Sequence, residues 1–117
     1  MATALTPEML LSAYAGGIFP MAENRGDEEL FWVDPRQRGV LPLDGFHISR
    51  SLAKTIRSSR FTISYDVDFK GVVKGCAARD ETWINDMLET LYGQLHLARM
   101  SLSVEVWDGE TLVGGIF

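Results

Sequence analysis

Three basic side chains, Arg50, Lys54 and Arg57, are spaced to share one face of a predicted helix. Basic side chains in such a stripe can contact the phosphate backbone of a nucleic acid. These contacts contribute affinity but do not distinguish one nucleotide sequence from another. The chain carries a net charge of −5, but residues 35–79 hold nine bases against three acids. A local anionic partner fits this pattern better than general nucleic-acid affinity does. From charge alone, an ordinary solvated helix surface with no binding partner is an equally good interpretation of these residues.

Aromatic and apolar side chains form a second candidate group, which comprises Tyr14, Phe19, Met21 and Trp83. Tyr14 lies just before the segment Gly-Gly-Ile-Phe-Pro and Phe19 lies within it, and both suit the walls of an apolar, concave site. Ordinary core packing is the alternative for both residues. Trp83, judged by its residue type alone, is expected in the core.

Other residues with ligating or catalytic chemistry are few. Cys76 is the only cysteine, so an intrachain disulfide is impossible, and a zinc site would need His47, His96 and scattered carboxylates. We therefore expect no metal and no cofactor. We expect a structural role for His47, because the sequence fixes no acid partner for it. No residue is assigned as catalytic.

The composition indicates one soluble globular core. The chain has 117 residues, of which 46% are hydrophobic and 23% are charged. No apolar run approaches the roughly 18 residues that span a bilayer, and the start does not resemble a signal peptide. The expected compartment is the cytoplasm.

Periodicity and capping residues predict alternating helices and strands. Thr6 and Pro7 begin the first helix, Asp68 and Asn85 cap two later ones, and Leu52 and Ile56 should face inward. The predicted helices are 7–15, a helix that starts at 49 or 51 and ends at 58, 68–76 and 85–95. The predicted strands are 30–33, 61–65, 102–107 and 111–117, and residues 40–43 are expected to form a further extended piece. Residues 18–21 are expected to form an apolar loop.

The final segment gives the clearest hairpin signal, because Asp108 and Gly109 form a two-residue turn between two alternating runs. A strand that stops at Phe117 would leave an apolar edge, which natural sheets usually cover or charge. We therefore expect the chain to be the truncated part of a larger fold.

Five segments together resemble one known family in content, order and spacing. They are residues 11–20 (with "AYxxGIFP"), 31–36, 47–51 ("HISRS"), 82–84 and 103–115. The chain resembles the leucyl/phenylalanyl-tRNA–protein transferases, which move leucine or phenylalanine from a charged tRNA to an N-terminal Arg or Lys of a protein and mark it for degradation.

The resemblance implies an α+β fold. A small N-terminal α/β domain (1–44) would precede the first half of an acetyltransferase-like α/β domain with a mostly antiparallel sheet (45–117). The acidic pocket residue and the Asp/Gln pair that assist transfer in the family have no counterpart here, so we expect the isolated chain to be inactive.

The resemblance also implies roles for particular residues. Trp83 matches the tryptophan that stacks on the terminal adenosine, and Arg50 matches a family arginine at the start of the basic stripe. Met21 stands where the family commonly has a second aromatic residue. Because methionine has no ring, Met21 offers no flat face of its own. Arg99 stands in a segment where the family usually has a glycine and histidines.

Two alternatives to the transferase remain open. The chain could be a non-catalytic tRNA-binding or partner-binding remnant that self-associates through residues 111–117. An acyltransferase of the acetyl-CoA type would need a glycine-rich pyrophosphate loop at a helix start, and the sequence has none.

Overall fold

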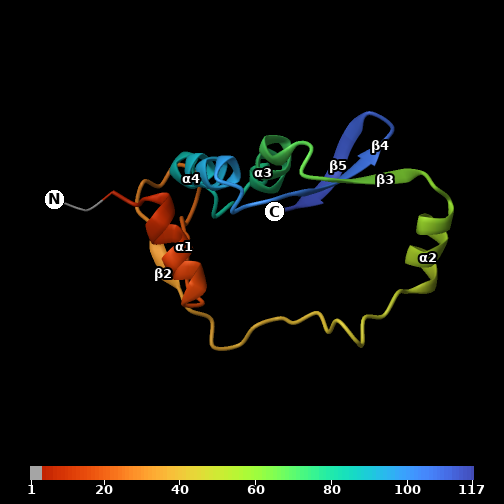
Figure 1. Ribbon diagram of the computed structural model, residues 1–117, viewed down its shortest axis with the longest axis horizontal. Coiled ribbons are helices and arrows are strands. Elements are labelled where there is room, and N and C mark those ends of the chain that lie inside the picture. Colours follow the sequence, from red (N-terminus) through yellow and green to blue (C-terminus); the bar gives the residue numbers. More distant parts are fainter. Residues whose placement is uncertain (1–3) are drawn as a thin grey trace.

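The computed structural model describes residues 4–117 and shows an α+β protein with four helices and two antiparallel sheets in that range. Figure 1 shows α1, α4 and the β1–β2 pair at one end, with α2 and the tips of the larger sheet at the other. The predicted α+β class is confirmed.

Helix α1 (Pro7–Ala15) begins and ends at the predicted residues. The Thr6 side chain accepts a hydrogen bond from the Met9 N–H at 3.2 Å, and Pro7 occupies the first turn. Gly17, with φ of 81°, adopts the left-handed conformation that lets the chain turn back after the helix. Leu10 is fully buried against α4.

Strands β1 (Phe19–Met21) and β2 (Phe31–Val33) pair antiparallel, with Phe19 opposite Val33 and Met21 opposite Phe31. The prediction of a loop over residues 18–21 was wrong. The pairing partner lies ten residues along the chain from Met21, beyond an acidic loop, so the short apolar run carries no local strand signal.

Residues 34–49 run as an extended segment to α2 (Arg50–Arg57), as Figure 1 shows, and this segment includes the expected extended piece at 40–43 but no strand. The prediction that Leu52 and Ile56 face a core was also wrong, because their exposed fractions are 43% and 60%. Ser49 caps α2, since its Oγ accepts from the Leu52 N–H at 3.1 Å. Local capping forms this helix, and no element in residues 4–117 buries its apolar side.

The larger sheet has the order β3–β4–β5, formed by Phe61–Tyr65, Val104–Asp108 and Thr111–Ile116. The predicted hairpin joins β4 to β5, with a register shift between Val106 and Trp107. Its two-residue turn is Gly109-Glu110 and not Asp108-Gly109, because Asp108 is the last residue of β4 and pairs with Thr111. Helix α3 (Phe69–Ala77) packs on this sheet, and Gly115 permits the close approach. A Cβ on Gly115 would lie 2.8 Å from both the Val104 carbonyl oxygen and a Val72 methyl group.

Helix α4 (Asp86–Leu97) completes the core between α1 and α3. Its cap is Asn85, whose Oδ1 accepts from the Leu88 N–H at 2.9 Å, and Asp68 caps α3 in the same way, as predicted. The chain leaves α4 through Arg99, which has φ of 59°. Arg99 thus adopts the left-handed conformation that a glycine would take without strain.

Candidate functional site

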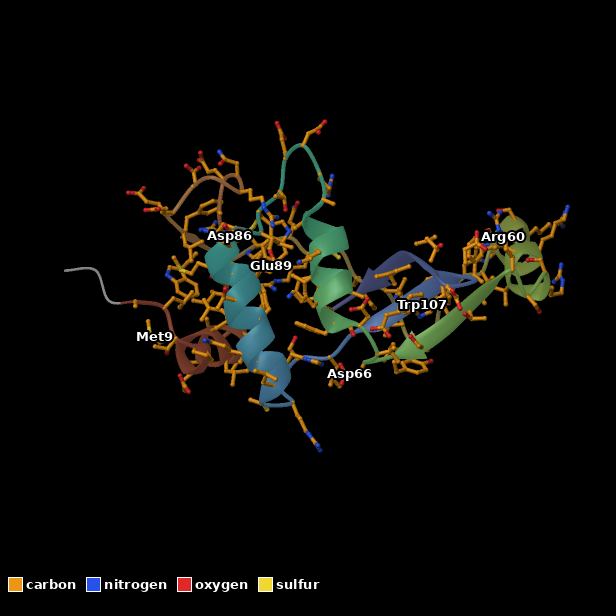
Figure 2. All side chains as sticks on the ribbon, turned by 90° about the horizontal axis from the view of Figure 1, so that it is seen from above. Met9, Arg60, Asp66, Asp86, Glu89 and Trp107 are labelled. Carbon is orange, nitrogen blue, oxygen red and sulfur yellow. The ribbon has the colours of Figure 1, made fainter. Side chains whose placement is uncertain are left out.

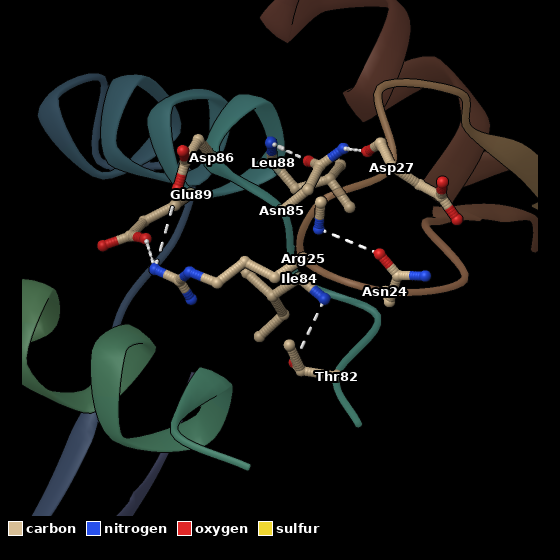
Figure 3. A network of polar contacts seen from close by, with 10 residues as sticks. Asn24, Arg25, Asp27, Thr82, Ile84, Asn85, Asp86, Leu88 and Glu89 are labelled. Atoms are coloured by element: carbon tan, nitrogen blue, oxygen red, sulfur yellow. Dashed lines mark hydrogen bonds and ion pairs between the residues drawn. The ribbon is translucent and has the colours of Figure 1, made fainter. Parts of the chain in front are cut away.

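Trp83 lies in the connection between α3 and α4, where its two neighbours fix the backbone. Thr82 and Ile84 are both buried, and the Ile84 N–H donates to Thr82 Oγ1 at 3.2 Å. The next residue, Asn85, is buried as well and donates from Nδ2 to the Asp27 carbonyl at 2.9 Å. Figure 3 shows this network. A half-buried ring held between two buried residues is pre-positioned.

Ion pairs fasten the acidic loop 22–30 to the start of α4. Arg25 Nη2 lies 3.1 Å from Glu89 Oε2 and 3.7 Å from Asp86 Oδ1 (Figure 3). The Ala22 N–H donates to the Trp83 carbonyl at 3.0 Å, which joins the end of β1 directly to the Trp83 loop. The two segments therefore form one wall, although some 60 residues separate them in sequence.

A hollow of about 570 Å³ opens where these segments meet, and we call it the aromatic hollow. Its lining residues are Met21, Ala22, Glu23, Asn24, Phe31, Glu81, Thr82 and Trp83. Of the four predicted aminoacyl-tRNA-binding residues, Met21 and Trp83 line it. Phe31, opposite Met21 in the strand pair, adds an aromatic ring that is 45% exposed.

The other two predicted residues, Tyr14 and Phe19, lie outside this lining. Their rings stack on each other with centroids 6.4 Å apart and an interplanar angle of 19°. Tyr92 connects them to the hollow, because its hydroxyl shares a 2.6 Å hydrogen bond with Tyr14 and its ring meets Trp83 edge-on. Burial, followed by the contact with Tyr14, raises the pKa of Tyr92, so this hydroxyl stays protonated.

The basic stripe lies elsewhere. Arg50, Lys54 and Arg57 are exposed on α2, and none forms an ion pair within residues 4–117. Figure 2 shows Arg60, near α2, and Met9, on α1, at opposite ends of the molecule. The molecule is 55 Å long, so a ligand that touches both the stripe and the aromatic hollow must be extended.

Glu105, on β4, is the one fully buried acidic side chain in the described range. Its carboxylate accepts hydrogen bonds from the Ser103 hydroxyl, the Ser64 hydroxyl at 2.5 Å and the Val67 N–H at 3.1 Å. Burial alone would raise the pKa of Glu105, but these donors and the backbone of Asp68 lower it to about 2. The carboxylate therefore ties the β3–α3 turn to the sheet.

The remaining candidates lie outside the lining of the aromatic hollow, and His96 Nε2 lies 2.7 Å from Asp66 Oδ1. His47 is exposed in the segment 34–49, and no hydrogen bond reaches it in the described part of the chain. Burial raises the pKa of the Cys76 thiol, which makes it a poor nucleophile.

Residues 4–117 contain no cluster of three or more His, Cys, Asp or Glu suited to hold a metal ion. No helix in that range is long and apolar enough to cross a membrane.

The fold and the site define an α+β protein with an aromatic hollow suited to a flat ligand and a separate exposed basic helix. The family model described as leucyl/phenylalanyl-tRNA protein transferase matches residues 40–117, and the model of that family's N-terminal domain matches residues 3–36. The chain belongs to the leucyl/phenylalanyl-tRNA protein transferase family.

Curated relatives agree with this assignment. Proteins named leucyl/phenylalanyl-tRNA–protein transferase from Roseobacter denitrificans and Cereibacter sphaeroides are 56% and 58% identical to it over 97% of the chain. A protein of the same name from Jannaschia is 50% identical. The chain covers 54%, 53% and 53% of these relatives, so it spans about half of their length.

Two residues of the site escaped the sequence reasoning. Phe31 was placed in a strand without a functional role, because its approach to Trp83 depends on a pairing between distant segments. Tyr92 lies in the predicted helix 85–95 and was given no role; the one sequence signal for its polar contact is that a buried tyrosine hydroxyl needs a hydrogen-bond partner.

Proposed function

We propose that the protein takes part in the transfer of leucine or phenylalanine from a charged tRNA to the N-terminal Arg or Lys of an acceptor protein. In this proposal the 117-residue chain supplies the site for the aminoacyl end of the tRNA and does not itself catalyse the transfer. The observation that carries the proposal is the aromatic hollow in a member of this family. Trp83 and Phe31 offer exposed ring surface there, and aromatic stacking on a base stabilises binding by roughly 1–3 kcal/mol.

The reaction needs no metal or nucleotide, because the ester that links the amino acid to tRNA is already activated. The acceptor's α-amine attacks the ester carbonyl, the tetrahedral intermediate collapses, and the ribose hydroxyl leaves with a proton as the amide forms. Catalysis then requires orientation of two substrates, proton transfer and stabilisation of the oxyanion. The aromatic hollow would contribute orientation.

The basic stripe has a separate role in this proposal. Arg50, Lys54 and Arg57 would contact tRNA phosphates far from the aminoacyl end. This arrangement would favour a folded tRNA over a free aminoacyl nucleoside, since only an extended ligand can reach both sites. Residues 1–44 would form the N-terminal domain and residues 45–117 part of the second domain, and the enzyme would act in the cytoplasm, where charged tRNA is found.

A phenylalanyl-adenosine analogue with an amide in place of the ester tests the first part. Binding that is lost in Trp83→Ala, at an unchanged melting temperature, would support the proposal. Equal affinity of the wild type and Trp83→Ala for this analogue would contradict it.

The alternative of a non-catalytic remnant that self-associates also has an observation in its favour. Strand β5 is an edge of the larger sheet in residues 4–117, and Val113 and Ile116 are exposed on it. A second copy could pair with this edge. Light scattering should then show association that Val113→Lys reduces, whereas a monomeric wild-type chain would contradict this alternative.

A further inference from the structure

A second hollow lies on the other side of β2 from the aromatic hollow, and we call it the methionine hollow. It has a volume of about 620 Å³ and is lined by Ala4, Leu5, Met9, Glu28, Glu29, Leu30, Trp32 and Met87. Its walls come from α1, β2 and the first turn of α4. Leu5 and Leu30 form the floor, because both pack against the main core.

The walls are unusually apolar for an open surface. Met9, Trp32 and Met87 are each at least 40% exposed. Methionine side chains are flexible and polarisable, and they recur on surfaces that bind several different sequences. A tryptophan among them supplies a large rigid contact, the residue type that most often dominates binding energy at interfaces.

The surroundings of the methionine hollow are acidic. Arg25 is the only base among residues 1–34, and Asp86 and Glu89 already pair with it. Glu8, Glu28 and Glu29 form no ion pair within residues 4–117. The local potential therefore favours a cationic partner and disfavours the phosphates of tRNA.

The two hollows are continuous along the surface. A third hollow of about 400 Å³ shares Glu23 and Phe31 with the aromatic hollow, and it shares Glu28, Glu29 and Leu30 with the methionine hollow. A polypeptide in the methionine hollow could thus extend past the acidic loop to the aromatic hollow without crossing the core.

We propose that the methionine hollow binds the acceptor polypeptide, through a basic and apolar segment that follows its N-terminal residue. The partner's identity rests on the proposed transfer activity, whereas its chemistry rests on the hollow itself. An acceptor surface of this kind suits a transferase that modifies many proteins, because adaptable methionines tolerate varied apolar side chains. The charge of the loop orients the acceptor with its cationic end toward the ester.

Neighbouring residues of β2 allow a matched test. Phe31 and Trp32 have nearly equal exposure, 45% and 47%, and they line different hollows. The probe is a short peptide that begins with arginine, contains lysine and leucine, and carries fluorescein at its C-terminal end. Its binding to the 117-residue chain is measured by anisotropy, without tRNA.

Trp32→Leu and Met87→Ala should each weaken peptide binding, the first by roughly tenfold, since a central tryptophan contributes on the order of 1–2 kcal/mol or more. The double variant Glu28→Gln with Glu29→Gln should weaken binding and flatten its salt dependence. Phe31→Leu should weaken peptide binding less than Trp32→Leu does, because Phe31 lies outside the methionine hollow, and the exposed control Glu110→Gln should leave the peptide affinity unchanged.

The same variants separate this proposal from the proposed function. Trp32→Leu should bind the phenylalanyl-adenosine analogue normally, and Phe31→Leu should not. If Trp32→Leu leaves peptide affinity unchanged while Phe31→Leu impairs analogue binding, the acceptor surface is wrong and the transferase proposal stands. A peptide with glutamate in place of lysine that binds as tightly would also overturn the acceptor surface.

Crosslinking identifies the occupant directly. A photoreactive benzoylphenylalanine at position 87 should label the bound peptide, and mass spectrometry of the adduct should locate its apolar residue. A crosslink to a second copy of the chain, or to residues 1–3 of the same chain, in the presence of saturating peptide would overturn the proposal.

Discussion

Met21 and Phe31 lie directly opposite each other in the β1–β2 pair, and both line the hollow that also contains Trp83. Met21 itself offers no flat face, so the strand partner supplies the aromatic surface on this side of the hollow. The pairing register therefore decides whether a base can be contacted by rings from two segments.

The ring of Phe31 should contribute to binding of the aminoacyl end of tRNA. Phe31→Leu should weaken binding of the phenylalanyl-adenosine analogue by roughly 1 kcal/mol or more, because leucine keeps apolar volume and loses the π face. Phe31→Trp should retain the affinity. Titration by intrinsic fluorescence measures both, with Trp32→Leu as the control on the opposite face of β2; equal losses in Phe31→Leu and Trp32→Leu would contradict the assignment.

Trp83 should matter more for binding than for stability. Trp83→Ala should lose roughly 1–3 kcal/mol of binding to the aminoacyl end. Its ring is only half-buried, and the buried neighbours Thr82 and Ile84 keep their positions, so the melting temperature should change little. A thermal melt of the variant decides the matter: collapse of the fold without a selective binding defect would make Trp83 a core residue.

The stripe on α2 should act on tRNA through charge. Replacing Arg50, Lys54 and Arg57 together by alanine should weaken tRNA binding and lower the slope of log affinity against log salt. Each lost phosphate contact should reduce the magnitude of that slope by about 0.7 on single-stranded RNA. On duplex RNA the reduction should be about 0.9, which is the value for duplex DNA. The helix buries none of these side chains, so stability should hardly change. An unchanged slope would show that the three residues do not contact tRNA phosphates and are ordinary charged surface residues.

Glu105 should make stability depend on acid. Its pKa falls from an ordinary value of 4.5 to about 2, so its stabilising contribution is complete above about pH 4.5 and is lost as the pH falls toward 2. Glu105→Gln should be less stable at pH 7 by on the order of 1–3 kcal/mol, because an amide NH2 group replaces one of the two acceptor oxygens and faces groups that donate hydrogen bonds to the carboxylate. Denaturant unfolding at several pH values should also show a flatter profile than in Glu110→Gln. Parallel profiles in the two variants would contradict this account.

Local chemistry explains which parts of the fold could be predicted. Thr6, Asp68 and Asn85 cap their helices through contacts within three residues, and Gly109 marks the tight turn of the hairpin, which begins one residue later than predicted. These signals lie within a few residues in the sequence, so they are readable without the fold.

Non-local packing explains what could not be predicted. Periodicity identifies the apolar side of α2, but it does not say whether another element covers Leu52 and Ile56. The roles of Phe31 and Tyr92 likewise depend on contacts with Met21 and Tyr14, which lie 10 and 78 residues away. The predicted site residues Met21 and Trp83 line the same hollow, whereas Tyr14 and Phe19 lie outside its lining and Tyr92 links Tyr14 to Trp83.

The most direct measurement follows tRNA binding and transfer in the same samples. The purified 117-residue chain is incubated with radiolabelled phenylalanyl-tRNA and a peptide that begins with arginine, and both bound tRNA and labelled peptide are counted. We predict binding that Trp83→Ala reduces, and no transfer, because the chain supplies orientation and holds no acid or base shown to act at the ester. Robust transfer by the monomeric chain would contradict this account and would place the chemistry on residues present here, with Glu105 and His47 the first to be replaced.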